Sequence, residues 1–299
     1  MKKYLQISLF IYILTHLSGC SISELTVRAS MPLIDGGIIA MNQQTDLEIA
    51  VSALPANISL IEGMLIKDPH NEALRIYAAQ AYYGYAFGFI EDGYISNGSA
   101  VKGNHERAAR LYQKGYHHAQ QILFGHGLSQ SLLDGDLEEL QVAINQLNDD
   151  TVPALFWAAS CWAKAIDLNR HNASDLAELP KTVMLMQRVL DLDEHYYMSG
   201  AHVFFGVYYG SKSPMLGGNY QLSEEHFSIA AQANENKLLI VKLLQAQYLE
   251  RQRFSQQAFH DLLTQIRQAS ATLYPEQALI NEISKYKASL LLNKEEQWF

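Results

Sequence analysis

The stretch LPANISLIEGMLIKDPHNEALRIYAAQAYYGYAFGFIE, residues 54–91, decides the fold class. Its first half places Ile58, Ile61 and Leu65 on one helical stripe. The residues Asp-Pro-His-Asn at 68–71 then break the helix, because proline is unfavourable inside a helix but suits a helix start. A second helical stripe follows, made of Leu74, Tyr77, Ala78, Ala81, Tyr85 and Phe89. The stretch therefore predicts two antiparallel helices joined by a short turn, which is a tetratricopeptide-like unit.

Weaker copies of this unit extend the pattern along the chain. The second copy is residues 179–210, LPKTVMLMQRVLDLDEHYYMSGAHVFFGVYYG. Leucine, proline, aspartate, histidine and tyrosine recur there at the positions they have in the first unit, and these matches fall at helix starts and apolar sites. A third, looser unit covers residues 223–252, whereas alternating strand patterns are hard to find. Further helices are predicted at 105–123, 137–147, 153–168, 255–272 and 276–293. The prediction is an all-α, tetratricopeptide-like helical repeat array, an α-α superhelix whose stacked pairs bury a continuous core and leave a concave surface.

The first residues have the pattern of an export signal. Lys2 and Lys3 precede an apolar run of about eleven residues, which as a helix covers about 16 Å and is too short for a bilayer core of about 30 Å. Leu17-Ser18-Gly19-Cys20 resembles the lipobox of bacterial lipoproteins, in which the cysteine thiol accepts a diacylglyceryl group. We therefore predict lipidation at Cys20, and a free cysteine after an ordinary cleavage site is the alternative.

This interpretation divides the chain into three parts. They are a lipoprotein signal peptide at 1–19, an N-terminal tether and first helix at 20–45, and a single helical-repeat domain at 46–299. Ser21, rather than an aspartate, follows the cysteine. By resemblance to the enterobacterial sorting rule, this favours a lipid anchor in the outer membrane, with the protein facing the periplasm.

The charge balance argues against a nucleic-acid partner. Removing Lys2 and Lys3 from the 22 basic residues leaves 20 against 31 acidic residues, a net charge of −11. Such a chain repels phosphate backbones and anionic lipid surfaces. With Cys20 lipidated, Cys161 has no cysteine partner in the chain, and its apolar surroundings predict a small buried side chain.

Aromatic side chains are the candidate ligand-binding residues. They cluster on the second helices of the two best repeats and around the run FWAASCWA. They line a cleft for an apolar or organic-acid ligand, or they pack the core between stacked helices, and the sequence leaves both interpretations open. The candidates are Tyr82, Tyr83, Phe87, Trp157, Trp162, Phe204 and Tyr208.

Two further patterns bear on chemistry. Gly217-Gly218-Asn219 predicts a structural turn with Asn219 as a helix N-cap, although a glycine-rich helix start also binds anions in other proteins. No His-Glu-x-x-His motif, Cys/His cluster, nucleophile elbow or triad spacing is present. We therefore expect no metal, no cofactor and no enzyme activity.

Several blocks together resemble the T component (TatT) family associated with TRAP transporters. They are DPHN with AAQAYYGYAFGFIED, ERAARLYQKGYHHA, PALFWAASCWAKAI, the segment MSGAHVFFGVYYGSKSPMLGGNYQLSEEHFSIA, and YPEQALINEISKYKASLLL. FWAAS and PMLGGN are the most specific of them. The sequence departs from the common pattern at Lys164, where a less charged residue is expected, and at Asn219, where aspartate is frequent.

The resemblance implies more than the residue pattern does. It implies a periplasm-facing lipoprotein that forms a ring-like oligomer, a trimer, and has a hydrophobic tunnel or cleft. It also implies pairing with the extracytoplasmic solute-binding (P) subunit of a TRAP transporter. The alternative function is a tetratricopeptide-like envelope scaffold that binds only protein. A continuous cavity between the aromatic helices favours the transport hypothesis, and interdigitated rings favour the scaffold.

Overall fold

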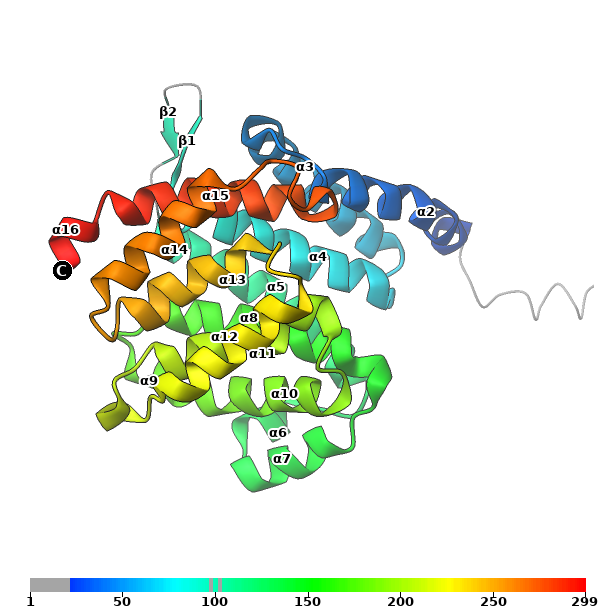
Figure 1. The fold of residues 1–299 in the computed structure, drawn as a ribbon. Coiled ribbons are helices and arrows are strands. Elements are labelled where there is room, and N and C mark those ends of the chain that lie inside the picture. Colours follow the sequence, from blue (N-terminus) through cyan, green and yellow to red (C-terminus); the bar gives the residue numbers. More distant parts are fainter. Residues whose placement is uncertain (1–21, 97–98, 102–103) are drawn as a thin grey trace, which may run out of the picture.

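The computed structural model describes residues 22–96, 99–101 and 104–299, which are almost entirely helical (Figure 1). The predicted all-α fold is confirmed. The strands of this described part are β1 (Tyr94–Ser96) and β2 (Ser99–Val101), an antiparallel hairpin with Ile95 opposite Ala100 that the sequence analysis missed. The signal peptide and Cys20 lie outside the described residues, so the lipidation stays a prediction.

The remaining elements follow one another with short connections. Up to the middle of the chain they are α2 (Ile22–Asn42), α3 (Leu47–Lys67), α4 (Glu72–Tyr85), the π-helix η1 (Ala86–Ile90), α5 (His105–Gly125), α6 (Gln130–Asp134), α7 (Leu137–Asn145), η2 (Asp149–Thr151) and α8 (Val152–Leu168). After it they are α9 (Ala173–Ala177), α10 (Leu179–Leu192), α11 (Tyr196–Gly210), η3 (Pro214–Leu216), α12 (Tyr220–Ala233), α13 (Leu239–Leu244), the π-helix η4 (Gln245–Glu250), α14 (Gln256–Gln268), η5 (Pro275–Gln277), α15 (Ala278–Leu292) and α16 (Glu295–Trp298).

The stretch at 54–91 forms the predicted helix pair α3–α4. Asn71 caps α4, because its side-chain oxygen accepts a hydrogen bond from the backbone N–H of Leu74 at 3.1 Å. Ile61 and Leu65 of α3 pack against Leu74 of α4 in one buried cluster. The hydrophobic stripe and the proline turn together therefore produce this hairpin, as predicted.

The start of α3 differs from the prediction. The helix begins at Leu47, capped by Asp46, so Pro55 lies inside the helix rather than at its start. A proline there removes one backbone hydrogen bond, and the burial of Leu54 and Ile58 on either side stabilises the helix nonetheless. α3 is also long and apolar enough to cross a membrane by length and composition, but it packs against α2 and α4 within the array.

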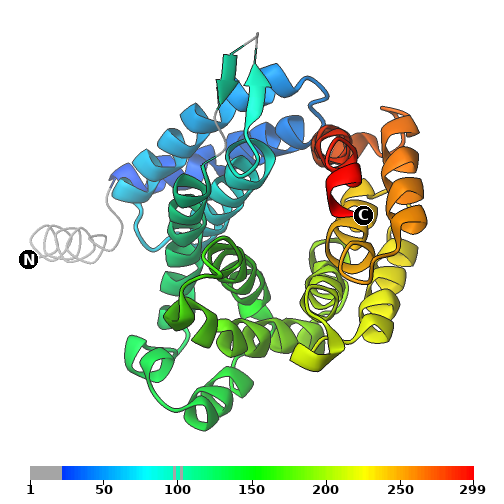
Figure 2. The same cartoon turned by 90° about the vertical axis from the view of Figure 1, so that its left-hand side faces the viewer.

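The helices are arranged in a ring (Figure 2). Along one side α4, α5, α8 and α10 pack in succession, and on the other α11 packs on α12 and α13 packs on α14 and α15. α15 then contacts α2 and α3, so the end of the chain closes the ring against its beginning. This closure brings the inner faces of the helices around one shared space.

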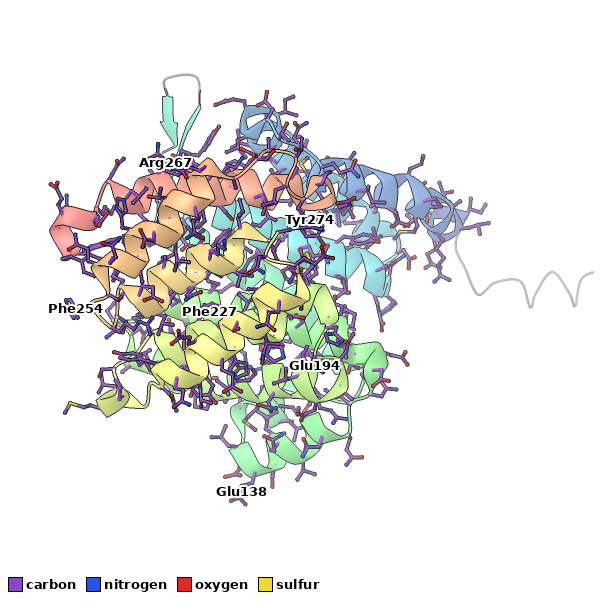
Figure 3. The ribbon with its side chains drawn as sticks, viewed as in Figure 1. Glu138, Glu194, Phe227, Phe254, Arg267 and Tyr274 are labelled. Atoms are coloured by element: carbon purple, nitrogen blue, oxygen red, sulfur yellow. The ribbon has the colours of Figure 1, made fainter. Side chains whose placement is uncertain are left out.

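The pair α11–α12 crosses closely because α11 carries glycines at the contact. Phe227 of α12, labelled in Figure 3, is fully buried, and its ring atoms lie 2.9 Å from where a Cβ on Gly206 would sit. The Ser223 hydroxyl donates a hydrogen bond to the Gly206 carbonyl at 2.6 Å. A larger residue at position 206 would therefore push α12 away from the ring.

The second repeat copy deviates from a simple helix pair. Tyr197, Met198 and Ser199 have φ values of 48°, 61° and 60°, which is a left-handed turn at the start of α11. Such a conformation costs about 1–2 kcal/mol per non-glycine residue. The turn brings the Tyr197 ring to within 4.8 Å of the Trp157 ring, centroid to centroid, on the inner side of the ring of helices.

Candidate functional site

A cavity of about 790 Å³ lies inside the ring of helices. Side chains of α2, α3, α4, α8, α11, α13 and α15 line it, and most of them are apolar. Five of the seven predicted ligand-binding residues are in its wall: Tyr83, Phe87, Trp157, Phe204 and Tyr208. The arrangement is a continuous apolar chamber of the size that accommodates small organic ligands.

The other two predicted residues lie outside the cavity wall. Tyr82 is buried, and its hydroxyl donates a hydrogen bond to Glu62 at 2.7 Å. Trp162 packs against Tyr116, with ring centroids 4.8 Å apart. Adjacent or closely spaced aromatic residues on a helix point in different directions, so only part of each group reaches the cavity.

Aromatic rings pack edge to face across the cavity wall. The Tyr83 ring contacts Tyr112 and Trp157, with centroid distances of 5.2 and 5.5 Å and interplanar angles near perpendicular at 64° and 68°. Such contacts stabilise each ring pair by about 0.5–1.5 kcal/mol beyond the burial of area. Tyr83 and Trp157 therefore both pack against neighbouring rings and line the cavity.

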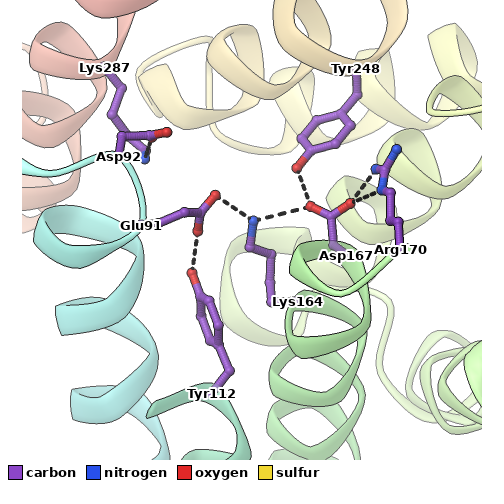
Figure 4. Close-up of polar contacts among 8 residues, drawn as sticks. All are labelled: Glu91, Asp92, Tyr112, Lys164, Asp167, Arg170, Tyr248 and Lys287. Carbon is purple, nitrogen blue, oxygen red and sulfur yellow. Dashed lines mark hydrogen bonds and ion pairs between the residues drawn. The ribbon is translucent and has the colours of Figure 1, made fainter. Parts of the chain in front are cut away.

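A buried network of charges lies at one end of the cavity (Figure 4). The Lys164 ammonium lies 2.8 Å from a Glu91 carboxylate oxygen and 3.4 Å from Asp167. The other Glu91 oxygen accepts a hydrogen bond from the Tyr112 hydroxyl at 2.7 Å. Asp167 also accepts hydrogen bonds from Tyr248 at 2.9 Å and from Arg170 Nε at 2.6 Å.

Two π-helices position this network. η1 ends at Ile90, directly before Glu91, and η4 carries Tyr248 in its middle. A π-turn inserts an extra residue into a helix, shifts the direction of the following side chains, and frequently occurs at functional sites. Beside Glu91, Asp92 forms an ion pair with Lys287 of α15, which connects the network to the last long helix.

Neighbouring groups of opposite charge stabilise the ionised forms of Lys164 and Asp167 in this buried network. Burial alone would lower the pKa of Lys164, but Glu91 and the other anionic neighbours raise it well above its usual value. Burial alone would raise the pKa of Asp167, but Lys164 and Arg170 hold it below its usual value. Lys164 and Asp167 are therefore both charged at neutral pH.

A smaller polar pocket of about 220 Å³ adjoins the apolar cavity. Five residues line both spaces: Asp167, Arg170, Ser211, Tyr248 and Gln252. His105, Gln247 and Arg251 complete the polar wall together with Glu91 and Asp92. One end of the apolar chamber is therefore polar and charged, while the α2 and α3 residues contribute only to the apolar chamber.

Two cations at this end have no carboxylate partner among the described residues. Lys212 lies over the Tyr208 ring, 3.9 Å from its centroid, and Arg251 lies over the Trp298 ring at 4.4 Å. By contrast, each carboxylate of the two walls (Glu91, Asp92 and Asp167) has a cation partner. The polar end is therefore locally richer in positive charge, although the chain as a whole is acidic.

The glycine pair 217–218 shapes the loop that carries Lys212. Gly217 has φ of 84°, a left-handed conformation that glycine adopts without strain. A Cβ on Gly218 would lie 1.9 Å from the Lys212 carbonyl oxygen. Asn219 caps α12, since its side chain accepts a hydrogen bond from the Leu222 N–H at 3.0 Å. The loop thus folds back tightly and places Lys212 and Leu216 in the cavity wall.

Sequence reasoning found only part of this site. Of its charged residues, the sequence analysis singled out Lys164, as a position where a less charged residue is expected. Asp167, Arg170 and Tyr248 were missed, because Tyr248 lies 81 residues from Asp167 in sequence and no local pattern links them. No cluster of three or more potential metal-ligating residues occurs in the part of the chain that the structure describes.

Comparison with known proteins adds one match. A family model described as TRAP transporter T-component matches residues 43–299. This range starts in the linker after α2 and includes every helix from α3 to α16. No curated protein matches the chain.

Proposed function

This chain belongs to the TRAP transporter T-component family, an accessory component of TRAP transport systems, and we propose on that basis how it acts. It is a lipoprotein anchored through Cys20, outside the described residues, at the periplasmic face, with the outer membrane favoured. It binds the solute-binding (P) subunit and works as a homo-oligomer, a trimer. Its cavity holds an apolar or amphipathic organic acid on behalf of the transport system.

The observation that carries the ligand proposal is the apolar cavity of about 790 Å³ with one charged end. Pockets for small organic ligands have volumes of about 300–1,000 Å³, apolar walls and a few polar groups that fix orientation. The cavity supports this proposal over the protein-only scaffold, because a scaffold needs no chamber on its inner side.

The charged end suggests how a ligand is oriented. Lys164 is already neutralised by Glu91 and Asp167, so it is not available to a ligand carboxylate. Lys212 and Arg251 have no carboxylate partner within the described part of the chain, so their hydrogen-bond donors can serve a ligand. An aliphatic chain in the apolar chamber with its carboxylate toward these two cations satisfies both parts of the site.

Charge selectivity tests this orientation with two probes of equal chain length, dodecanoate and dodecanol. The double variant Lys212→Gln/Arg251→Gln is expected to bind dodecanoate about tenfold more weakly, a loss of about 1.4 kcal/mol, and dodecanol unchanged. Isothermal titration calorimetry measures both affinities. The control Lys67→Gln/Arg110→Gln removes the same charge from exposed sites outside both pockets. Equal weakening in both variants would contradict a specific head-group site.

The partner proposal is tested with the mature lipoprotein in detergent. Native mass spectrometry with candidate P subunits is expected to show an oligomer, a complex with the P subunit, and the mass of an acylated Cys20. The matched sample is the same lipoprotein with an unrelated periplasmic binding protein, which is expected to remain unbound. Absence of both oligomer and complex would contradict the accessory mechanism proposed here.

A further inference from the structure

α2 exposes an apolar stripe along its whole outer side. The stripe starts at the first residue of the helix, and its large members are far more exposed than is usual: Ile22 86%, Leu25 65%, Leu33 79% and Ile39 58%. The exposed residues between them at helical spacing are small or uncharged: Ala29, Pro32, Gly36 and Ala40. An uncharged stripe of this length on a surface helix indicates a surface that something else covers.

Other side chains of α2 contact the neighbouring helices of the ring. Val27 packs in the buried cluster with residues of α3 and α4. Arg28 forms an ion pair with Asp68 at 3.2 Å, and Asp35 accepts a hydrogen bond from the Tyr77 hydroxyl at 2.6 Å. Arg28 and Asp35 therefore both bind other parts of the protein, and none of the stripe residues named above carries a charge.

The position of α2 identifies what covers this stripe. We propose that the outer face of α2 rests on the lipid bilayer, an inference that depends on the proposed acylation of Cys20. Cys20 lies two residues before Ile22, so an extended chain keeps the helix start within about 7 Å of the acylated residue. The stripe also contains none of the aromatic residues, methionine and arginine that are enriched in protein interfaces.

This placement also puts the apolar part of the cavity next to the bilayer. Leu33 belongs both to the exposed stripe and to the cavity wall, and Ile34, Gly37, Ile38 and Met41 of the same helix line the cavity as well. The polar pocket includes no residue of α2. A bilayer under α2 therefore lies beside the apolar part of the chamber, and an apolar molecule can pass between the lipid and the cavity over a short distance.

Site-specific fluorescence tests the contact in the acylated protein. The variant Leu25→Cys carries a nitrobenzoxadiazole label, and the native Cys161 is fully buried and stays unlabelled. In phosphatidylcholine vesicles that contain a nitroxide lipid, this label is expected to lose at least about half of its fluorescence. Leu33→Cys provides a second position on the stripe. The matched control is Glu138→Cys on α7, which lies on the opposite side of the protein from α2 and is expected to keep its fluorescence (Figure 3).

Each outcome decides the inference. Quenching at positions 25 and 33 but not at 138 supports it. An acylated protein whose stripe labels are not quenched overturns the α2 contact and leaves the lipid anchor intact. In a further outcome, labels at positions 25 and 33 are shielded from the nitroxide lipid while the unlabelled cysteine variants form disulfide cross-links between protein copies. That result overturns the bilayer contact and shows that a second copy covers the stripe. A mass spectrum without acyl chains on Cys20 overturns the proposed anchor, and the inference with it.

Discussion

Replacing Lys164 with methionine is expected to lower the free energy of unfolding by about 3–5 kcal/mol, since removing one partner of a buried ion pair leaves an uncompensated charge. Lys164 is the cation nearest Glu91, whose side chain is only 7% exposed. In this variant Asp167 still has its ion pair with Arg170, so Glu91 is the carboxylate that loses its cation partner. Urea unfolding followed by circular dichroism at neutral pH measures the change.

A second substitution separates charge from packing. In the double variant Lys164→Met/Glu91→Gln, the amide still accepts the Tyr112 hydrogen bond and carries no charge, so most of the lost stability is expected to return. The exposed control Lys67→Met is expected to change stability by less than about 1 kcal/mol. Equal stabilities of the single and double variants would show that an unpaired Glu91 charge does not cause the destabilisation.

The pH dependence gives an independent check on the same network. Asp167 has a pKa below its usual value in the folded protein, so the unfolded state takes up its proton first as pH falls. Its stabilising contribution is therefore complete above about pH 4–5 and is lost as pH falls further, through the lowered pKa of the folded state. Lys164 contributes to lowering the pKa of Asp167, so the variant Lys164→Met is expected to lose the Asp167 contribution at a higher pH than the wild type, which urea unfolding at a series of pH values measures.

Filling the cavity is the second change with a large expected effect. Gly84 of α4 lines the cavity, and no atom lies within 4 Å of where its Cβ would be. Gly84→Trp is therefore expected to place the indole in the chamber without a clash and to weaken dodecanol binding at least about 100-fold, which is about 2.7 kcal/mol. Isothermal titration calorimetry with dodecanol measures the loss.

The chain offers a matched control for this substitution. Gly63 of α3 is also helical and also has open space around its Cβ position, but it is exposed and does not line the cavity. Gly63→Trp makes the same change in helix propensity and is expected to leave dodecanol binding unchanged. If Gly84→Trp binds dodecanol as the wild type does, the chamber is not the binding site.

Local patterns predicted the helices well but not their irregular parts. Helical spacing of apolar residues identified α3, α4, α5, α8 and α15 to within a few residues at most ends, apart from the start of α3. The π-helices at 86–90 and 245–250 and the left-handed turn at 197–199 have no such signature. Their sequences fit an ordinary α-helix, and contacts with distant helices favour the unusual backbone.

The sequence by itself determined the all-α class, the hairpin of α3 and α4, and most of the aromatic residues that line the cavity. These features follow from short-range rules, because hydrophobic periodicity and proline turns act within a few residues. Only the tertiary structure decided that α15 meets α2 and α3 to close the ring, and that Lys164 meets Glu91 across 73 residues of sequence. Such contacts depend on how whole helices pack, so the chamber and its charged end form only when the ring is complete.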